Sequence, residues 1–240
     1  MSHGWKAEPV LEGTGWSSTC TLLTGPGGRG IVDTGLSIQE GALVRALRAK
    51  GVAPSDVDFV INTHLHLDHC SNNCIFPRAA IFLSEAEWRW TDAFYATIFA
   101  SKTPEQVAPE FYPELASHNL PLKTIRNVAR MVKLFWNRAR VAENRFHWIE
   151  TSALPAGLEV LKTPGHTPHH ISIRIASPVP VLIAGDAVLA EDANAKIRTM
   201  IPFSGAQFRA VRQSLLEQGG LIIPGHGPAF EPKPIGVPSA

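Results

Sequence analysis

The segment from Asn62 to His69 constrains this chain more than any other, because four side chains that can bind a metal fall within six residues. These side chains are His64, His66, Asp68 and His69. Residues two apart on an extended backbone point to the same side, whereas His69 points elsewhere and could serve a second ion. Imidazole and carboxylate ligands suit zinc, and also iron or manganese. The segment therefore predicts a loop that reaches two metal ions.

Three further ligand candidates share one local context, in which a short apolar run is followed by glycine and then by the ligand. They are His166 after Gly165, Asp186 after Gly185, and His226 after Gly225. Each follows a predicted strand, and glycine lets the backbone turn sharply or approach another loop closely. If these strand ends converge on the Asn62–His69 loop, five His and two Asp can serve two catalytic metals with open positions for water.

Two polar residues near these motifs are candidates for supporting roles. Asp33 follows a predicted strand, where it either caps the turn or acts as a buried carboxylate that orients a metal-bound histidine. His170 lies four residues past His166 and could support the ligands from behind. Cys70 and Cys74 are predicted to be buried thiols rather than ligands.

The remaining sequence predicts one α/β domain, residues 1–240, with a helical insertion at about 84–150. Strands are predicted at 20–23, 30–32, 58–62, 79–83, 158–161, 171–175, 181–184 and 221–223, and helices at 37–50 and 205–218. The insertion holds most of the aromatic residues. Two capping boxes, Ser84 with Glu87 and Thr103 with Gln106, predict helix starts within it.

The ligand motif resembles the HxHxDH signature of the metallo-β-lactamase superfamily, which His64-Leu-His66-Leu-Asp68-His69 matches. The similarity runs from about residue 20 to residue 230, with a His, an Asp and a His following in the same order. The resemblance implies an α/β (α+β) fold, an αββα sandwich with the metals at one edge. It also implies the ligand sets, which are His64, His66 and His166 for one ion, Asp68, His69 and His226 for the other, and Asp186 as a bridge.

The resemblance narrows the activity without fixing the substrate. Quorum-quenching lactonases share the whole ligand set, but they place a tyrosine three residues after the bridging Asp, where this chain has Leu189. Hydrolysis of a lactone or another small carboxylic ester is the leading prediction. Phosphodiester or nucleic-acid hydrolysis is the alternative, with β-lactam hydrolysis as a weak side activity. An iron-dependent sulfur dioxygenase and a non-catalytic binding protein are further readings.

Two divalent ions would supply the chemistry that such a ligand set supports. A hydroxide that bridges them is a nucleophile at neutral pH, because a metal lowers the pKa of its bound water to about 7. The second ion takes up charge that develops on the substrate oxygen. Asp68 is the predicted catalytic residue, which orients the water and passes its proton to the leaving group.

The insertion also contains a basic amphipathic segment, Lys123–Arg145, with seven bases and one acid, Glu143. Its apolar residues recur with the helical period. It predicts a helix that packs on the core with a solvated charged face, or one that serves as a lid, a lipid contact or a phosphate groove. The predicted lining of the substrate entrance comprises Phe94, Tyr95, Phe135, Trp136 and Leu189.

Composition sets the expected context. The formal net charge of +1 names no partner by itself, but it weakens the nucleic-acid alternative. A small-molecule substrate and no specific nucleic-acid partner are expected. Three cysteines are too few for a disulfide framework, so a cytoplasmic location is expected. The N-terminal residues contain no apolar stretch typical of a signal peptide, and no run is long enough for a transmembrane segment. The amphipathic insertion leaves a homodimer as a further possibility.

Overall fold

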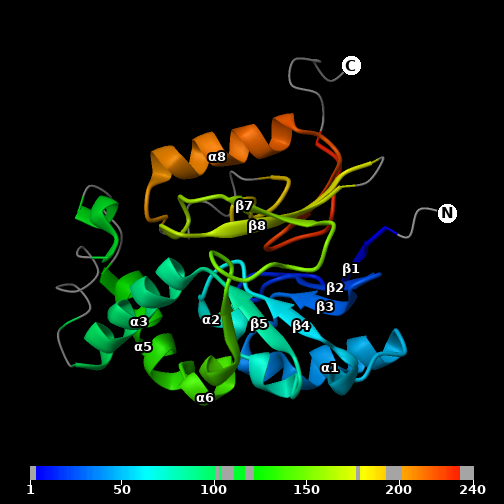
Figure 1. Ribbon diagram of the computed structural model, residues 1–240. Coiled ribbons are helices and arrows are strands. Elements are labelled where there is room, and N and C mark those ends of the chain that lie inside the picture. Colours follow the sequence, from blue (N-terminus) through cyan, green and yellow to red (C-terminus); the bar gives the residue numbers. More distant parts are fainter. Residues whose placement is uncertain are drawn as a thin grey trace.

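The computed structural model describes residues 4–100, 103, 111–116, 122–176, 179–192 and 202–232. Two β-sheets lie face to face, and helices cover the outer side of each (Figure 1). This architecture is the predicted αββα sandwich. Gln106 and His3 lie outside the described residues, so the second predicted capping box does too.

The first sheet has the strand order β1-β2-β3-β4-β5-β6. Its strands are β1 (Lys6–Leu11), β2 (Cys20–Gly25), β3 (Gly28–Val32), β4 (Phe59–Ile61), β5 (Ala80–Leu83) and β6 (Phe146–Trp148). The pairs from β1 to β3 are antiparallel, and those from β3 to β6 are parallel. The segments that follow β3, β4 and β5 therefore all leave the same edge of this sheet.

The second sheet has the order β10-β9-β8-β7. Its strands are β7 (Leu158–Lys162), β8 (Ile171–Ile175), β9 (Val181–Gly185) and β10 (Leu221–Pro224). β9 and β10 are parallel, whereas β8 is antiparallel to both of its neighbours. The chain therefore enters β8 at the edge where it leaves β9 and β10.

Apolar side chains fill the space between the two sheets. Ile171, Ile173 and Ile175 are spaced two apart on β8, so all three point inward, where they pack with Leu23 and Ile61 of the first sheet. Each of the three is at most 1% exposed. Burying one such side chain contributes about 1.5–3 kcal/mol, so this layer holds the two sheets together.

Helices on the two outer faces complete the sandwich. On the first sheet, α1 (Glu40–Ala49) buries Leu43 and Leu47. On the second sheet, α8 (Gly205–Glu217) buries Leu215. In Figure 1, α8 lies above its sheet and α1 lies below the other. Helix α8 agrees closely with its predicted range.

The insertion lies at one end of the sandwich (Figure 1). It contains α3 (Glu85–Phe99), a 3-10 turn (Pro113–Ala116), α5 (Leu122–Phe135) and α6 (Arg138–Val141). Its aromatic side chains form a cluster of their own that includes Phe94, Tyr95 and Tyr112. Leu36 and Leu67 of the sandwich pack into this cluster, so the insertion shares an apolar interface with the rest of the fold.

The basic segment is not the single helix that the apolar period predicts. Helix α5 ends at Phe135, and Asn137 then caps a new helix by accepting a hydrogen bond from the backbone N of Ala139 at 2.9 Å. Ala142 has a left-handed backbone with φ 57°, which ends α6. Apolar periodicity missed this break because the alternation of apolar and basic residues continues through it.

Three arginines of the basic segment brace the fold. Arg138 pairs with Asp92 of α3, with 2.6 Å between nitrogen and oxygen. The guanidinium group of Arg140 donates to the carbonyl oxygen of Ser71 at 2.9 Å, and that of Arg145 donates to the carbonyl oxygen of Ala79 at 2.9 Å. Arg140 and Arg145 therefore hold the insertion against segments next to the first sheet, whereas Arg138 joins two helices within the insertion.

Two strands were not predicted, and both lie at the edges of the first sheet. β6 falls inside the predicted helical insertion, so the helical part ends before Phe146. β1 contains Lys6, Glu8 and Pro9, which hide any strand pattern. Edge strands commonly carry such residues because their outer side is unpaired. In the described part of the chain, no helix has the length and apolar character needed to cross a membrane.

Candidate metal centre

The structure brings all seven predicted ligands together at one edge of the sandwich. His64 and His66 lie in the segment after β4, and Asp68 and His69 lie on the short helix α2 (Leu67–Cys70) that follows. The other three come from the second sheet. They are His166 from the β7–β8 connection, Asp186 directly after β9, and His226 after β10.

Two groups can be distinguished by the distances between candidate ligand atoms. Group one consists of His64, His66, His166 and Asp186, and group two consists of Asp68, His69 and His226. Within each group, the candidate ligand atoms all lie within 4.8 Å of one another. These are the two sets that the family resemblance implies, with Asp186 assigned to the first.

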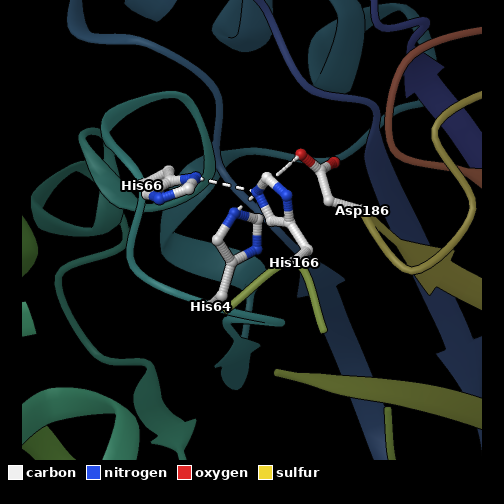
Figure 2. Close-up of side chains that lie close together, drawn as sticks. All are labelled: His64, His66, His166 and Asp186. Atoms are coloured by element: carbon white, nitrogen blue, oxygen red, sulfur yellow. Dashed lines mark hydrogen bonds and ion pairs between the residues drawn. The ribbon is translucent and has the colours of Figure 1, made fainter. Parts of the chain in front are cut away.

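Group one is drawn in Figure 2, where three imidazole rings meet beside one carboxylate. His66 Nδ1 lies 2.9 Å from His166 Nε2, and His166 Nε2 lies 3.2 Å from Asp186 Oδ2. His64 Nε2 is 4.0 Å from the same carboxylate oxygen. Each ring thus directs one nitrogen toward a common centre.

Asp186 faces both groups at once. Its Oδ2 lies toward His166 and His64 in group one. Its Oδ1 lies 3.3 Å from Nε2 of His69 and 3.3 Å from Nε2 of His226, both of which belong to group two. Asp68 Oδ2 completes group two, at 3.6 Å from His69 Nε2 and 3.5 Å from His226 Nε2.

The glycine that precedes each of two ligands is explained by the crowding at this edge. Gly185 has φ 53°, and a Cβ there would lie 2.8 Å from Thr63 Oγ1. A Cβ on Gly225 would collide with Oδ1 of Asp186. Any larger residue would push these loops apart. The sequence pattern therefore marks the places where the ligand loops approach one another closely.

The polar atoms at the centre fit a cation better than they fit one another. Nε2 of His64, Nε2 of His69 and both carboxylate oxygens of Asp186 are buried and make no hydrogen bond within the described part of the chain. Leaving such buried atoms unsatisfied costs about 1–3 kcal/mol each. Nitrogen and carboxylate oxygen are good zinc ligands, so divalent ions between these atoms would satisfy them.

Electrostatics support the same interpretation. Burial lowers the pKa of His66 to about 4 and lowers the pKa of His64 and of His166 well below the usual range. These rings are therefore neutral at pH 7, the form that binds metals. In group two, burial alone would lower the pKa of His69, but nearby carboxylates, Asp186 first, raise it well above the usual value. Group two therefore attracts positive charge.

Asp33 contacts a candidate metal-binding histidine in the way expected for an orienting carboxylate, which is one of the two roles predicted for it. Its Oδ2 accepts hydrogen bonds from His69 Nδ1 at 2.8 Å and from Thr63 Oγ1 at 2.8 Å. Because the Thr63 hydroxyl donates to Asp33, its oxygen is free to accept from His64 Nδ1, which lies 3.1 Å away. One buried carboxylate thus turns Nε2 of two histidines, one in each group, toward the centre.

His170 supports a ligand through the backbone rather than through a side chain. Its Nε2 accepts a hydrogen bond from the backbone N of Asp186 at 3.1 Å. Its Nδ1 lies 2.8 Å from Thr163 Oγ1. The ring therefore connects the turn after β9 to the end of β7. This contact agrees with the supporting role expected for His170.

Sequence reasoning missed two residues of the insertion that touch the ligand region. Tyr112 places its hydroxyl oxygen 3.0 Å from His66 Nε2. Glu87 accepts a hydrogen bond from Thr167 Oγ1, next to His166, at 2.8 Å.

Ser84 accepts a hydrogen bond from the backbone N of Glu87 at 3.4 Å, so the predicted N-cap is confirmed. The reciprocal half of that capping box is wrong, because the Glu87 side chain turns inward.

The five residues predicted to line the substrate entrance lie in packed surroundings. Phe94, Tyr95 and Leu189 are between 2% and 5% exposed. Trp136 packs on Tyr95 with ring centroids 4.5 Å apart, and Phe135 packs against the same aromatic cluster. These positions offer little free surface. A lining role for Phe94, Tyr95, Phe135, Trp136 and Leu189 stays a prediction.

A family comparison agrees with the fold and with this ligand geometry. The profile of the metallo-beta-lactamase superfamily matches residues 13–226, which include all seven candidate ligands. The chain therefore belongs to the metallo-beta-lactamase superfamily.

Comparison with individual proteins gives two further similarities. It is similar to metallo-beta-lactamase domain-containing protein 1 of Xenopus laevis, with 31% identity over 88% of this chain and 70% of the relative. It is also similar to an N-acyl homoserine lactonase of Bacillus sp, with 23% identity over 78% of this chain and 63% of the relative. The chain spans between 32% and 70% of the length of the first curated relatives that it matches.

Among solved structures, the chain resembles AidC, described as a dizinc quorum-quenching lactonase. The TM-score is 0.59 at 19% identity, and the match covers 93% of this chain and 79% of AidC. At this identity the likeness supports the fold alone.

Proposed function

We propose that this chain is a hydrolase that uses two divalent metal ions, most readily zinc. The observation that carries the proposal is the position of Asp186, a buried carboxylate whose two oxygens face two different sets of histidines. Among the residues that the structure describes, neither oxygen has a hydrogen-bond partner. A carboxylate in that position suits a ligand shared by two ions. Iron or manganese would fit the same nitrogen and oxygen ligands.

Asp68 is suited to proton transfer because it is the more accessible of the two carboxylates. Its side chain is 18% exposed, whereas that of Asp186 is 1% exposed. Asp68 can therefore face both an incoming water and a leaving group, while Asp186 stays inside. Bound divalent ions would supply a nucleophilic hydroxide at neutral pH and stabilise negative charge on the substrate. Asp68 would orient the water and carry its proton to the leaving group.

The substrate that we propose is a lactone or another small carboxylic ester. The N-acyl homoserine lactonases among the related sequences support it. The phosphodiester alternative rested on the basic segment. The basic segment supports that alternative less strongly, because Arg138, Arg140 and Arg145 form an ion pair or hydrogen bonds with other parts of the chain.

A substrate panel tests this proposal. Zinc-loaded protein is assayed with a lactone, a thioester, a β-lactam and a phosphodiester, alongside the Asp68→Asn variant. We expect the lactone to be hydrolysed fastest. Because Asp68 is also a candidate ligand of group two, the variant is assayed in excess zinc with its zinc content measured, and with both sites filled it should lose about a hundredfold or more in kcat.

Two results would contradict the proposal. Faster hydrolysis of the phosphodiester than of any carboxylic ester would support the alternative function, which is phosphodiester hydrolysis. Full activity of Asp68→Asn with intact zinc would remove Asp68 from the mechanism.

A further inference from the structure

In group one, the outer nitrogen of His66 contacts the insertion. Its Nδ1 points to the centre, 2.9 Å from His166 Nε2. Its Nε2 points away from the centre and lies 3.0 Å from the hydroxyl oxygen of Tyr112. Nδ1 of His66 therefore faces the centre of the site, whereas Nε2 faces the insertion.

The orientation of His66 is the reverse of that of the other oriented histidines. His64 and His69 present Nε2 to the centre, and Thr63 and Asp33 hold their Nδ1 atoms. An imidazole that binds a metal through Nδ1 must carry its proton on Nε2. That N–H needs an acceptor, and a hydroxyl oxygen provides one. Tyr112 is therefore placed to select the tautomer that His66 requires.

The packing around Tyr112 keeps its hydroxyl in place. Its ring is 7% exposed and makes edge contacts with Trp90 and with Phe94, each with centroids 5.4 Å apart. Two residues later, Glu114 accepts a hydrogen bond from the backbone N of Gly205 at 2.7 Å, at the start of α8. This short segment is thus anchored to both the aromatic cluster and the second sheet's helix.

We propose that Tyr112 is a positioning residue whose hydroxyl oxygen accepts a hydrogen bond from His66 Nε2 and so presents Nδ1 of His66 to the group-one metal. This inference rests on the proposed metal-dependent function. It makes the affinity of the group-one site depend on a hydrogen bond from the helical insertion, whereas the hydrogen bond that orients His69 in group two comes from Asp33 of the sandwich.

The chain offers a matched control, because Tyr95 and Tyr112 are its only two tyrosines. Both are buried in the same aromatic cluster. The Tyr95 hydroxyl donates to the carbonyl oxygen of Leu65 at 3.3 Å and contacts no ligand side chain. Tyr112→Phe and Tyr95→Phe therefore delete the same atom from the same surroundings, but only the first removes a partner of a candidate ligand.

The experiment measures zinc affinity of the full chain by competition with a chelator, together with His66 protonation by NMR of ¹⁵N-labelled histidine. For Tyr112→Phe we expect one zinc affinity to fall about 10–100-fold, the usual cost of losing such a partner, and the other to stay unchanged. The metal-free variant should show His66 in mixed tautomers. Tyr95→Phe should keep both affinities and the single tautomer.

Unchanged affinities in Tyr112→Phe, with a single His66 tautomer, would overturn the inference. An equal loss in Tyr95→Phe would also overturn it, because packing of the cluster would then be the cause. Failure of the proposed metal centre is distinguishable, since wild-type protein would in that case bind no zinc. Failure of the proposed activity is distinguishable too, since the zinc affinities are measured without substrate.

Discussion

The two ligand groups differ in which part of the fold holds them. Group two is held by the sandwich. Asp33 orients His69, the Ser18 hydroxyl donates to the carbonyl oxygen of Asp68, and the backbone N of His226 donates to Leu189. In group one, the insertion contributes Tyr112 beside His66 and Glu87 beside the loop of His166.

This difference shows how the insertion can influence chemistry without touching substrate. The side chains that support group two come from segments around the sandwich core. The contacts on His66 and on the His166 loop come from a segment with its own aromatic cluster. Loss of the Tyr112 hydrogen bond would therefore act on group one directly, whereas the cluster touches the group-two helix α2 through the apolar side chain of Leu67. Asp33 is the exception, because it also acts on His64 through Thr63.

Replacement of Asp33 is expected to have the largest effect, since it should abolish the difference between the groups. In Asp33→Asn, zinc affinity should fall about 10–100-fold at both sites, because the amide cannot accept from His69 and Thr63 as the carboxylate does. The backbone is not the cause, because Asn tolerates the left-handed φ of 57° found at this position. Chelator competition measures both affinities.

Tyr112→Phe is the natural comparison for this variant. If both zinc affinities fall in Asp33→Asn and only one falls in Tyr112→Phe, the two groups differ in their supporting residues as proposed. If only one affinity falls in Asp33→Asn, the proposal that Asp33 supports both groups is wrong.

A smaller effect is expected from Glu87, through which the insertion holds the His166 loop. Burial raises the pKa of Glu87 to about 7, although hydrogen bonds from Thr167 and from the backbone of Leu65 and His169 offset part of that rise. A raised carboxyl pKa means that the fold favours the protonated form. Its contribution to stability is therefore full below the unfolded-state pKa of about 4.5 and is lost as the pH rises through about 7.

Urea unfolding at pH 6 and pH 8 measures this effect. The free energy of unfolding of the wild type, taken relative to Glu87→Gln, should decrease by about 1 kcal/mol between the two pH values. Glu85→Gln is the control, because Glu85 lies on the same helix and pairs with Arg89 at the surface. If Glu85→Gln removes the pH dependence, or if Glu87→Gln keeps it, the assignment to Glu87 is wrong.

The strands and the ligand set were predictable because their signals are local. The eight predicted strands are apolar runs bounded by turn residues, and each predicted ligand stands in a short motif or after a strand-ending glycine. Their convergence follows from strand direction. Parallel strands β3, β4 and β5 end at one edge, and Asp33 and His64 follow two of them.

The contacts of the insertion were not predictable because they are not local. Tyr112 is 46 residues from His66, and Glu87 is 80 residues from Thr167. No periodic pattern surrounds Tyr112, and Glu87 resembled an ordinary helix-capping residue. Only the packing of the aromatic cluster against the ligand loops brings these side chains into place. A glutamate at helical spacing from Phe94 and Ile98, on the mostly apolar face of α3, is the signal that sequence alone offered.

The most direct test of the account is the metal content of the purified wild-type protein. Elemental analysis after loading with zinc and removal of excess ions gives the number of ions per chain. The account predicts close to two, one for each group, with Asp186 shared between them. A reproducible value near zero would contradict the metal centre itself, and a value near one would contradict the division into two groups.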